Sequence, residues 1–212
     1  MMRPLLLTCV LAGLARAQAP AAAPLRGDRF KPLAYDQMTA EQKVMADLVI
    51  SGKIQGGTGG PFNVLLRSPA LGQAVVRYGE YVRFRSPIPA KLNELAALVT
   101  TRYWTAQFPW YAHHRAAVQA GLSEAVISAI AEGRRPSSMQ PDEEVIFNFC
   151  TELLQTSEVS DATFRAAKDK LGEAGVVELL GIVGYYGTVS MLVNTDRYPL
   201  PEGVSPELKP LK

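Results

Sequence analysis

Cysteine and histidine are scarce in this chain, which holds two of each among its 212 residues. Cys9 lies in an apolar N-terminal run, so Cys150 has no partner for an intramolecular disulfide in the remaining chain. The adjacent pair His113 and His114 does not supply the three or four ligands that zinc normally requires. We therefore expect no disulfide framework, no metal and no other cofactor. Cys150 lies in an apolar run and is expected to be a small buried hydrophobe.

Signals for strands, for nucleic-acid binding and for membrane spans are also absent beyond the N-terminus. No alternating apolar and polar run bounded by turn residues stands out, which excludes an extensive sheet. Lysine and arginine total 22 against 20 acidic residues, and no basic tract is present, so nucleic acid is not an expected partner. No second apolar run is long enough to cross a bilayer. These absences predict an all-α protein without further membrane association.

The first seventeen residues have the features of an export signal. Arg3 gives a positive start, residues 5–14 are mostly apolar, and Ala-Arg-Ala at 15–17 fits a small-x-small cleavage site. The apolar run is short for a bilayer span, although an uncleaved anchor remains an alternative. We therefore predict a signal peptide at 1–17 and a secreted or periplasmic mature protein.

The remaining chain has the composition of one domain with flanking segments. Residues 18–35 are rich in alanine and proline, which predicts a flexible linker. Residues 36–205 are enough for a single domain with a substantial core. Residues 206–212 form a C-terminal tail, and the proline-rich end from 198 onward could pack across a neighbouring subunit.

Apolar spacing of three and four residues predicts about eight helices in this domain. They are expected at 39–51, 63–66, 70–83, 94–102, 109–120, 123–132, 141–155 and 160–171, with a long apolar helix from 173 onward. Residues 52–60 form a glycine-rich turn without the Lys-Ser/Thr ending of a phosphate loop. That turn is either a plain flexible loop or a lid over a pocket.

Residues 94–121 concentrate the side chains that can carry chemistry, because they hold both histidines and both tryptophans. Glu94 lies one helix upstream of His113, and a carboxylate beside an imidazole can support proton transfer near neutral pH. His113 and His114 point about 100° apart on a helix, so only one of them can face a given pocket. The alternatives are a first-turn carboxylate that suits the helix dipole and a structural histidine.

Four motifs in this order resemble the carboxymuconolactone decarboxylase family, within the alkyl hydroperoxide reductase D (AhpD)-like superfamily. They are GPFNVL with SPAL at 60–71, ELA at 94–96, WYAH at 110–113, and GYYG at 184–187 with PLP at 199–201. The resemblance covers roughly residues 38–205 and implies that family's helical core. It also implies assembly into homotrimers or homohexamers, with Glu94 and His113 as the site residues near subunit contacts.

One departure from the superfamily pattern concerns its redox branch, which carries Cys-x-x-Cys just before the histidine. Ala106 and Pro109 stand at the corresponding positions. Without a thiolate there is no nucleophile for a peroxide and no resolving thiol, which disfavours a peroxidase. The decarboxylase branch often has an acidic residue where Pro109 stands, so one acid/base group of that branch is missing too.

The preferred hypothesis is a cofactor-free lyase or isomerase that acts on a small carboxylated lactone or a related acid from aromatic breakdown. His113 would carry the proton and Glu94 would orient it. Substrate-binding candidates are arginines for the carboxylate and aromatic residues for an apolar wall: Arg83, Arg85, Arg102, Trp110, Tyr103 and Tyr185. The arginines could instead be solvated surface residues, and the aromatic residues could be core. A peroxidase and a non-catalytic small-molecule binding protein are the alternative functions.

Overall fold

The computed structural model describes residues 27, 29–54 and 57–210, and the regular secondary structure of this part of the chain is all helical. Its elements are η1 (Tyr35–Gln37), α1 (Ala40–Ser51), α2 (Pro61–Leu65), α3 (Pro69–Phe84), α4 (Ala90–Tyr103), α5 (Gln107–Gln119), α6 (Glu124–Ala131), α7 (Pro141–Thr156) and α8 (Asp161–Asp196). The prediction of an all-α fold with about eight helices is confirmed. The predicted signal peptide at 1–17 and the first part of the predicted linker lie outside the described residues.

Local sequence explains where most of these helices begin. Thr39 caps α1 through a capping box, in which its hydroxyl accepts from the Gln42 N–H and the Gln42 side chain accepts from the Thr39 N–H. Ser123 and Ser160 cap α6 and α8 in the simpler way, by accepting an N–H three residues on. Three other helices begin with a proline at the first position, namely Pro61, Pro69 and Pro141.

Three boundaries differ from the sequence prediction or refine it. Helix α4 begins at Ala90 instead of 94, so Glu94 does not lie in its first turn and the helix-dipole interpretation of that carboxylate is wrong. Helix α5 begins at Gln107 instead of Pro109, because the first helical N–H groups have no intrahelical partner and a proline is tolerated among them. Helix α8 contains one non-helical residue, Gly172, with φ 72° and ψ 172°. This break separates the two segments that were predicted as helices at 160–171 and from 173 onward.

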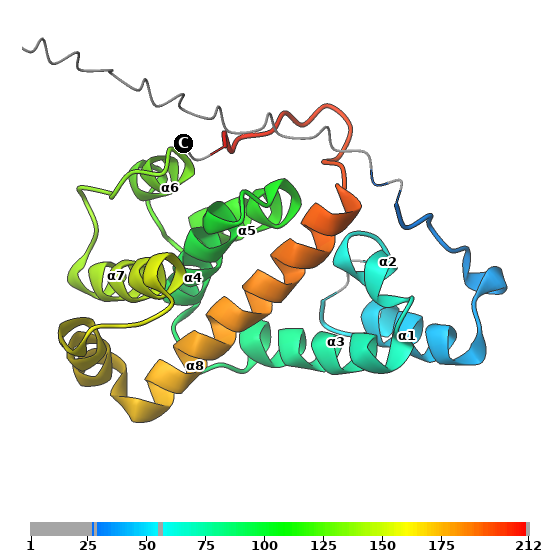
Figure 1. The fold of residues 1–212 in the computed structure, drawn as a ribbon, viewed down its shortest axis with the longest axis horizontal. Helices are drawn as coiled ribbons and strands as arrows, with labels where there is room; N and C mark the ends of the chain where they lie inside the picture. The colour runs from blue at the N-terminus through cyan, green and yellow to red at the C-terminus, as the bar shows by residue number, and fades with distance from the viewer. Residues whose placement is uncertain (1–26, 28, 55–56, 211–212) are drawn as a thin grey trace, which may run out of the picture.

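Helix α4 is the centre of the fold. Every residue from 92 to 102 is buried except Glu94, which is half-buried. Helices α5, α7 and α8 pack most closely around α4, as Figure 1 shows. Helix α8 runs diagonally between this group and a second group formed by α1, α2 and α3. The core therefore extends along α4 and the second half of α8. Glu94 is the one residue between 92 and 102 that is partly accessible to solvent.

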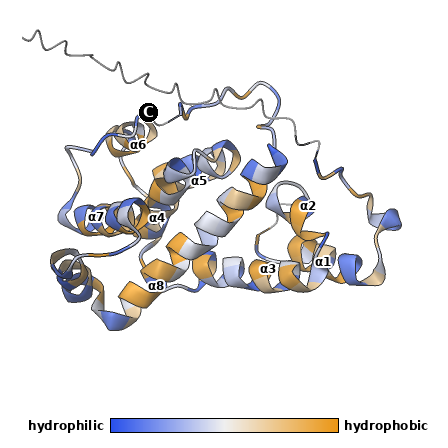
Figure 2. Cartoon of the chain, in the orientation of Figure 1, coloured by the Kyte–Doolittle hydropathy of each residue, from blue (hydrophilic) through white to orange (hydrophobic). Residues whose placement is uncertain are grey.

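Helix α8 is also the one described helix whose length and composition would suit a membrane span. Figure 2 shows apolar residues along much of its second half, which packs against α3, α4 and α7. In the apolar window, 56% of the residues are buried inside the protein. A buried core helix passes the same test as a membrane helix, so this feature is weak evidence for a span.

The C-terminal tail lies across the start of α5 and the end of α4. The side chain of Gln107 donates to the Leu208 carbonyl at 2.6 Å and accepts from the Leu208 N–H at 3.2 Å. Arg102 donates to the Lys209 carbonyl at 2.9 Å, and the Leu208 side chain is buried. This short segment, residues 207–209, is called the C-terminal strap below.

Part of the predicted linker is also attached to the domain. The Phe30 N–H donates to Asp196 at the end of α8, and Asn63 on α2 donates to the Phe30 carbonyl at 2.6 Å. Arg67 also donates to the Lys31 carbonyl. Residues 29–31 are therefore held against α2, Arg67 and the end of α8. Their alanine- and proline-rich surroundings did not predict this attachment.

Candidate active site

Helices α4 and α5 form a hairpin that places Glu94 beside His113. Trp104 marks the turn, with Glu94 ten residues before it and His113 nine residues after it. In an antiparallel hairpin, residues equally far from the turn lie opposite each other. Nδ1 of His113 is 2.6 Å from Oε2 of Glu94, a charge-assisted hydrogen bond. Because an ionised carboxylate only accepts, Nδ1 carries the proton and Nε2 is left as the free nitrogen.

This pair is largely removed from solvent. His113 is 6% exposed, and the Glu94 side chain is 17% exposed. The ring of Tyr186 meets the His113 ring edge to face at 4.5 Å between centroids. The Tyr186 hydroxyl is buried and has no hydrogen-bond partner among the described residues. The tyrosine ring beside the imidazole therefore carries a donor without a described partner.

The tyrosines beside His113 stay protonated at neutral pH. Burial raises the pKa of Tyr186 well above its usual value, and the negative charge of Glu94 raises it further. Burial likewise raises the pKa of Tyr185 to about 12, against the opposing effect of the Arg83 charge. Both phenols can therefore donate a hydrogen bond to a ligand but cannot act as bases.

His113 faces a cavity of about 230 Å³ between α2, α3, α5 and α8. Tyr185 and Tyr186 form one wall, and Arg83 at the end of α3 supplies a positive charge. The rest of the lining is mainly apolar: Ile54, Pro61, Phe62, Phe108, Pro109 and Val189. The arrangement combines a proton-transfer pair, two phenol donors and one cation in a mostly apolar space, which suits a small acidic ligand.

The structure does not bring all predicted site residues to this cavity. Arg83 and Tyr185 lie on its wall with His113, whereas Arg85 lines neither described cavity and is exposed just after α3. Arg102 and Tyr103 line a separate cavity of about 340 Å³. Arg102 lies two helical turns beyond Glu94, about 12 Å along α4, at the turn end of the hairpin. Arg102 and Tyr103 were predicted at the site because they lie close to Glu94 in sequence, but the structure places them at the other cavity.

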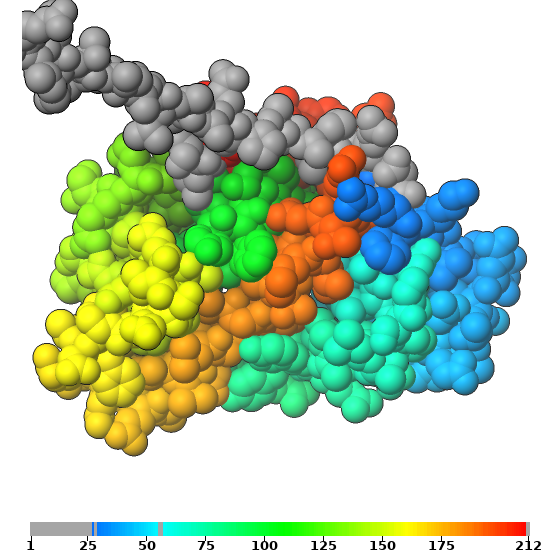
Figure 3. All heavy atoms as spheres, viewed as in Figure 1, coloured from blue at the N-terminus to red at the C-terminus, as the bar shows by residue number. Residues whose placement is uncertain are grey.

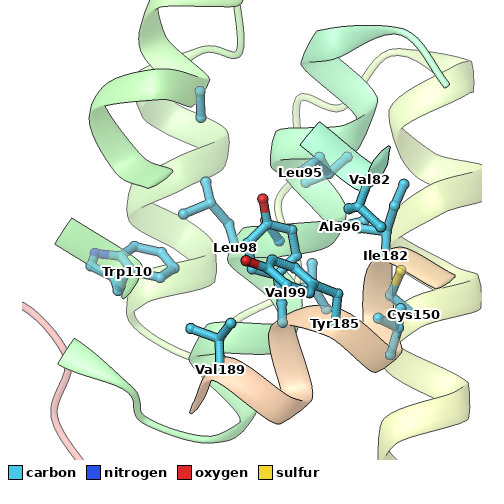
Figure 4. Close-up of a cluster of buried hydrophobic side chains, with 14 of the residues drawn as sticks. Val82, Leu95, Ala96, Leu98, Val99, Trp110, Cys150, Ile182, Tyr185 and Val189 are labelled. Carbon is cyan, nitrogen blue, oxygen red and sulfur yellow. The ribbon is translucent and has the colours of Figure 1, made fainter. Parts of the chain in front are cut away.

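Trp110 does not form part of the apolar wall either. Its side chain is 1% exposed and belongs to the core cluster drawn in Figure 4, where Trp110 and Tyr185 come from different helices. Its indole N–H donates to Glu207 of the C-terminal strap at 2.8 Å. The observed position of Trp110 is structural, because its polar edge holds the strap and its ring fills the core.

Sequence reasoning did not select Tyr186, Phe62 or Phe108 as site residues. Tyr186 follows Tyr185 directly on α8, and both line the cavity. Phe62 follows the glycine-rich turn, and Phe108 lies one residue before Pro109. The GPFN segment was the one available signal for Phe62, and it was noted as a motif without a role.

Neither a metal nor a reactive thiol is indicated by the described side chains. No group of three or more His, Cys, Asp or Glu side chains is placed to hold a metal ion within residues 27, 29–54 and 57–210. Cys150 on α7 is fully buried, and burial raises the pKa of its thiol. Ala106 and Pro109, the positions that the resemblance aligns with the cysteines of a redox branch, lie at the α4–α5 turn and in the first turn of α5.

A glycine on α3 controls the shape of the cavity. A Cβ at Gly79 would lie 2.2 Å from the Tyr185 hydroxyl and 2.5 Å from the ring carbon that carries it. Gly79→Ala should push Tyr185 out of place and cost about 1–3 kcal/mol of unfolding free energy, as overpacking usually does. Chemical denaturation measures this loss.

Gly181 on α8 supplies the matched control. A Cβ there would meet the Tyr78 hydroxyl at 3.7 Å, an ordinary contact. Gly181→Ala should raise the unfolding free energy by up to about 1 kcal/mol, because alanine is the better helix former. Equal stability of the two variants would contradict the close packing of Tyr185 on Gly79.

His114 connects the C-terminal strap to α6 and should make the strap sensitive to pH. Its Nδ1 is 2.8 Å from Glu207, and its Nε2 is 3.2 Å from Glu124. Burial opposes the charged imidazole, but the hydrogen bonds and charges of Glu207 and Glu124 outweigh it, so the pKa of His114 is raised. The resulting stabilisation is complete below the unfolded value near 6.5 and is lost as pH rises through the higher folded pKa.

We expect the wild type to lose stability relative to His114→Gln as pH rises above about 6.5. The difference should stay below about 1 kcal/mol, since Glu124 is largely exposed and water screens the pair. Denaturant unfolding of both proteins at several pH values gives the difference in unfolding free energy. Both proteins contain His113, so its titration cancels in this difference. A difference that is constant or that grows in the opposite direction would refute this account of His114.

Comparison with known proteins supports the fold but not a specific family. No protein-family model and no curated protein sequence matches the chain. Among solved structures, the chain is similar to a protein of unknown function from Agrobacterium tumefaciens, described as a candidate AhpD antioxidant defence protein. The TM-score is 0.59 at 18% identity, over 67% of this chain and 99% of the other. The fold is AhpD-like, and identity at this level says nothing about activity.

Proposed function

We propose that this protein is a cofactor-free enzyme that transfers a proton to or from a small carboxylated lactone or a related acid. The observation that carries the proposal is the 2.6 Å contact between Glu94 and His113, with the imidazole facing a mainly apolar cavity. The four motifs that resemble the carboxymuconolactone decarboxylase family favour a lyase or isomerase within this broad class.

In this proposal His113 is the acid/base group. Glu94 holds Nδ1–H and so presents Nε2 to the cavity in a fixed orientation. The same carboxylate stabilises the imidazolium that forms when Nε2 takes a proton. A positioned histidine of this kind typically contributes about 10²–10⁴-fold to a rate.

Arg83 and Tyr186 are proposed to hold the negative charges of the reaction. The guanidinium of Arg83 would bind the substrate carboxylate at the cavity wall, where that charge has a mostly apolar background. The Tyr186 hydroxyl has no partner among the described residues and keeps its proton, so it can donate to a developing enolate oxygen.

For decarboxylation, the bond from the substrate carbon to its carboxylate breaks and carbon dioxide leaves. The bonding electron pair passes into an enolate conjugated with the lactone carbonyl. The His113 imidazolium then gives its proton to the substrate carbon, and water restores that proton. For isomerisation, His113 removes a proton from one carbon and returns it to another, so that atoms and charge also balance.

Export and oligomerisation are part of the same proposal. The N-terminal residues support removal of 1–17 and a secreted or periplasmic location, which intact-mass measurement of the mature protein tests. Large apolar side chains exposed on the neighbouring helices α3 and α8 support a homotrimer or homohexamer; they are Leu71, Phe84, Val177, Leu180 and Met191. Figure 3 shows these two helices adjoining on the surface. Light scattering after size exclusion gives the mass.

The decisive experiment is a deuterium-exchange assay with small carboxylated lactones and keto acids. Each acid is incubated with the protein in D₂O, and proton NMR follows both deuterium incorporation and loss of the carboxylate. Decarboxylation leaves deuterium at the protonated carbon. Isomerisation leaves deuterium there when the proton on His113 exchanges with solvent, and otherwise shows in the same spectra as the rearranged product.

Exchange or turnover by the wild type that Arg83→Gln weakens chiefly through KM would support the proposal. Saturable binding of these acids without exchange would overturn it in favour of a non-catalytic binding protein. Peroxide consumption with a dithiol reductant would overturn it in favour of a peroxidase, although the fully buried Cys150 argues against that result.

A further inference from the structure

The larger described cavity lies away from His113 and has a different character. It has a volume of about 340 Å³ and lies among α4, α7 and the loop that follows α6. It shares no described lining residue with the cavity at His113. The proposed proton-transfer reaction therefore makes no use of it.

This cavity is positively charged on one side. Three arginines line it, namely Arg102, Arg134 and Arg135, and none of its described lining residues is acidic. Arg134 and Arg135 are exposed and paired with Glu132 and Glu144. Those two carboxylates are themselves exposed and lie outside the lining.

Arg102 differs from these two because it is buried and has no acidic partner among the described residues. It is 5% exposed, and its described contacts are the Thr105 hydroxyl at 3.2 Å and the Lys209 carbonyl at 2.9 Å. Its Nε has no hydrogen-bond partner among the described residues. A buried guanidinium that meets only neutral oxygens is expensive unless an anion joins it. Burial accordingly lowers the pKa of Arg102.

A second unsatisfied donor lies on the wall that α7 contributes. The Thr151 hydroxyl is buried and also has no partner among the described residues. Thr151 and Arg102 come from different helices and both line this cavity, and each has a buried polar atom without a described partner. Unsatisfied buried donors are rare in folded proteins, and two on one cavity indicate a missing acceptor.

The remaining wall of the cavity is apolar, so the part of the ligand that packs against it should be apolar too. Val99, Ile130, Phe147 and Leu154 line the cavity together with the ring of Tyr103. A ligand that fits must therefore combine an anionic acceptor with a compact apolar body. A carboxylate matches the planar fork of arginine in two-point contact and also accepts from a hydroxyl.

We infer that this second cavity binds a small monocarboxylate with an aromatic or branched aliphatic body. Its carboxylate takes the free donors of Arg102 and Thr151, and its apolar body packs on Phe147 and Leu154. Arg134 and Arg135 at the rim raise the local concentration of anions. This site is independent of the reaction at His113.

Calorimetric titration of the whole mature protein with phenylacetate tests this inference, with phenylacetamide as the uncharged match. We expect phenylacetate to bind at least about tenfold more tightly than the amide, because charge-assisted bonds to a buried arginine require the carboxylate. Arg102→Met should weaken phenylacetate at least about tenfold and leave the amide unchanged. Thr151→Val should weaken phenylacetate to a smaller extent.

Two further variants keep the test decisive. Leu154→Trp leaves Arg102 in place and fills the cavity, so it should abolish binding even if Arg102→Met does not fold. Arg83→Gln alters the other cavity and should leave unchanged the phenylacetate binding that Arg102→Met weakens. Equal binding of acid and amide, no binding at about 10 mM acid, or loss of binding in Arg83→Gln alone would overturn the inference.

Discussion

Replacing His113 with alanine should lower the rate of deuterium exchange by about 10²–10⁴-fold, the usual contribution of a positioned acid/base group. Among the described groups that line this cavity, the imidazole is the natural proton carrier by residue type, and burial keeps the two tyrosines protonated by raising their pKa. The loss should appear in kcat, with KM changed little, because Arg83 still binds the carboxylate.

Glu94→Gln tests the other half of the pair. Glutamine keeps the size of the side chain and can still accept from Nδ1–H, but it no longer stabilises the imidazolium. We expect a smaller fall in kcat than for His113→Ala, of about 10–10²-fold. Rates for this variant equal to the wild type would show that the short contact is structural.

His114→Gln is the control for both variants. His114 is adjacent in sequence, but it points away and contacts Glu207 and Glu124 on the strap and α6. Its replacement should leave kcat and KM unchanged. If His114→Gln abolishes exchange while His113→Ala does not, the assignment of the proton carrier is wrong.

The helices were predictable because local sequence determines where they begin. Thr39, Ser123 and Ser160 cap helices through side-chain oxygens, and apolar spacing marks the faces that the core then buries. The start of α5 was not predictable to the residue, since Pro109 fits any position in the first turn equally well. The strap was missed because its contacts to Gln107 and Trp110 span about 100 residues of sequence.

The candidate site was partly predictable for a related reason. Glu94 and His113 lie at nearly equal distances from one turn, so an antiparallel hairpin brings them together. The same hairpin geometry places Arg102 near the turn and away from His113. The short distance in sequence between Arg102 and Glu94 had instead predicted that Arg102 lies at the site. Arg83 and Tyr186 reach His113 only through the packing of α3 and α8 on α5, which depends on side chains from all three helices.

Trp110→Ala should be the most destabilising single change among the residues considered, at about 3–5 kcal/mol, which is typical for truncating a large buried aromatic side chain. The variant loses the packing of a ring that is 1% exposed. It also leaves Glu207 without its indole donor, although His114 still contacts the same carboxylate oxygen. Denaturant unfolding measures the loss directly.

Two matched variants separate the contributions of the ring and of its N–H group. Trp110→Phe keeps most of the apolar volume and removes the hydrogen bond to Glu207, so it should cost about 1–2 kcal/mol. Trp104→Ala truncates the other tryptophan, which is only half-buried at the end of α4, and should cost clearly less than Trp110→Ala. Equal losses at Trp104 and Trp110 would contradict the central position of Trp110. If Trp110→Phe is stable but exchanges deuterium far more slowly than the wild type, the indole acts on the reaction and the structural role is incomplete.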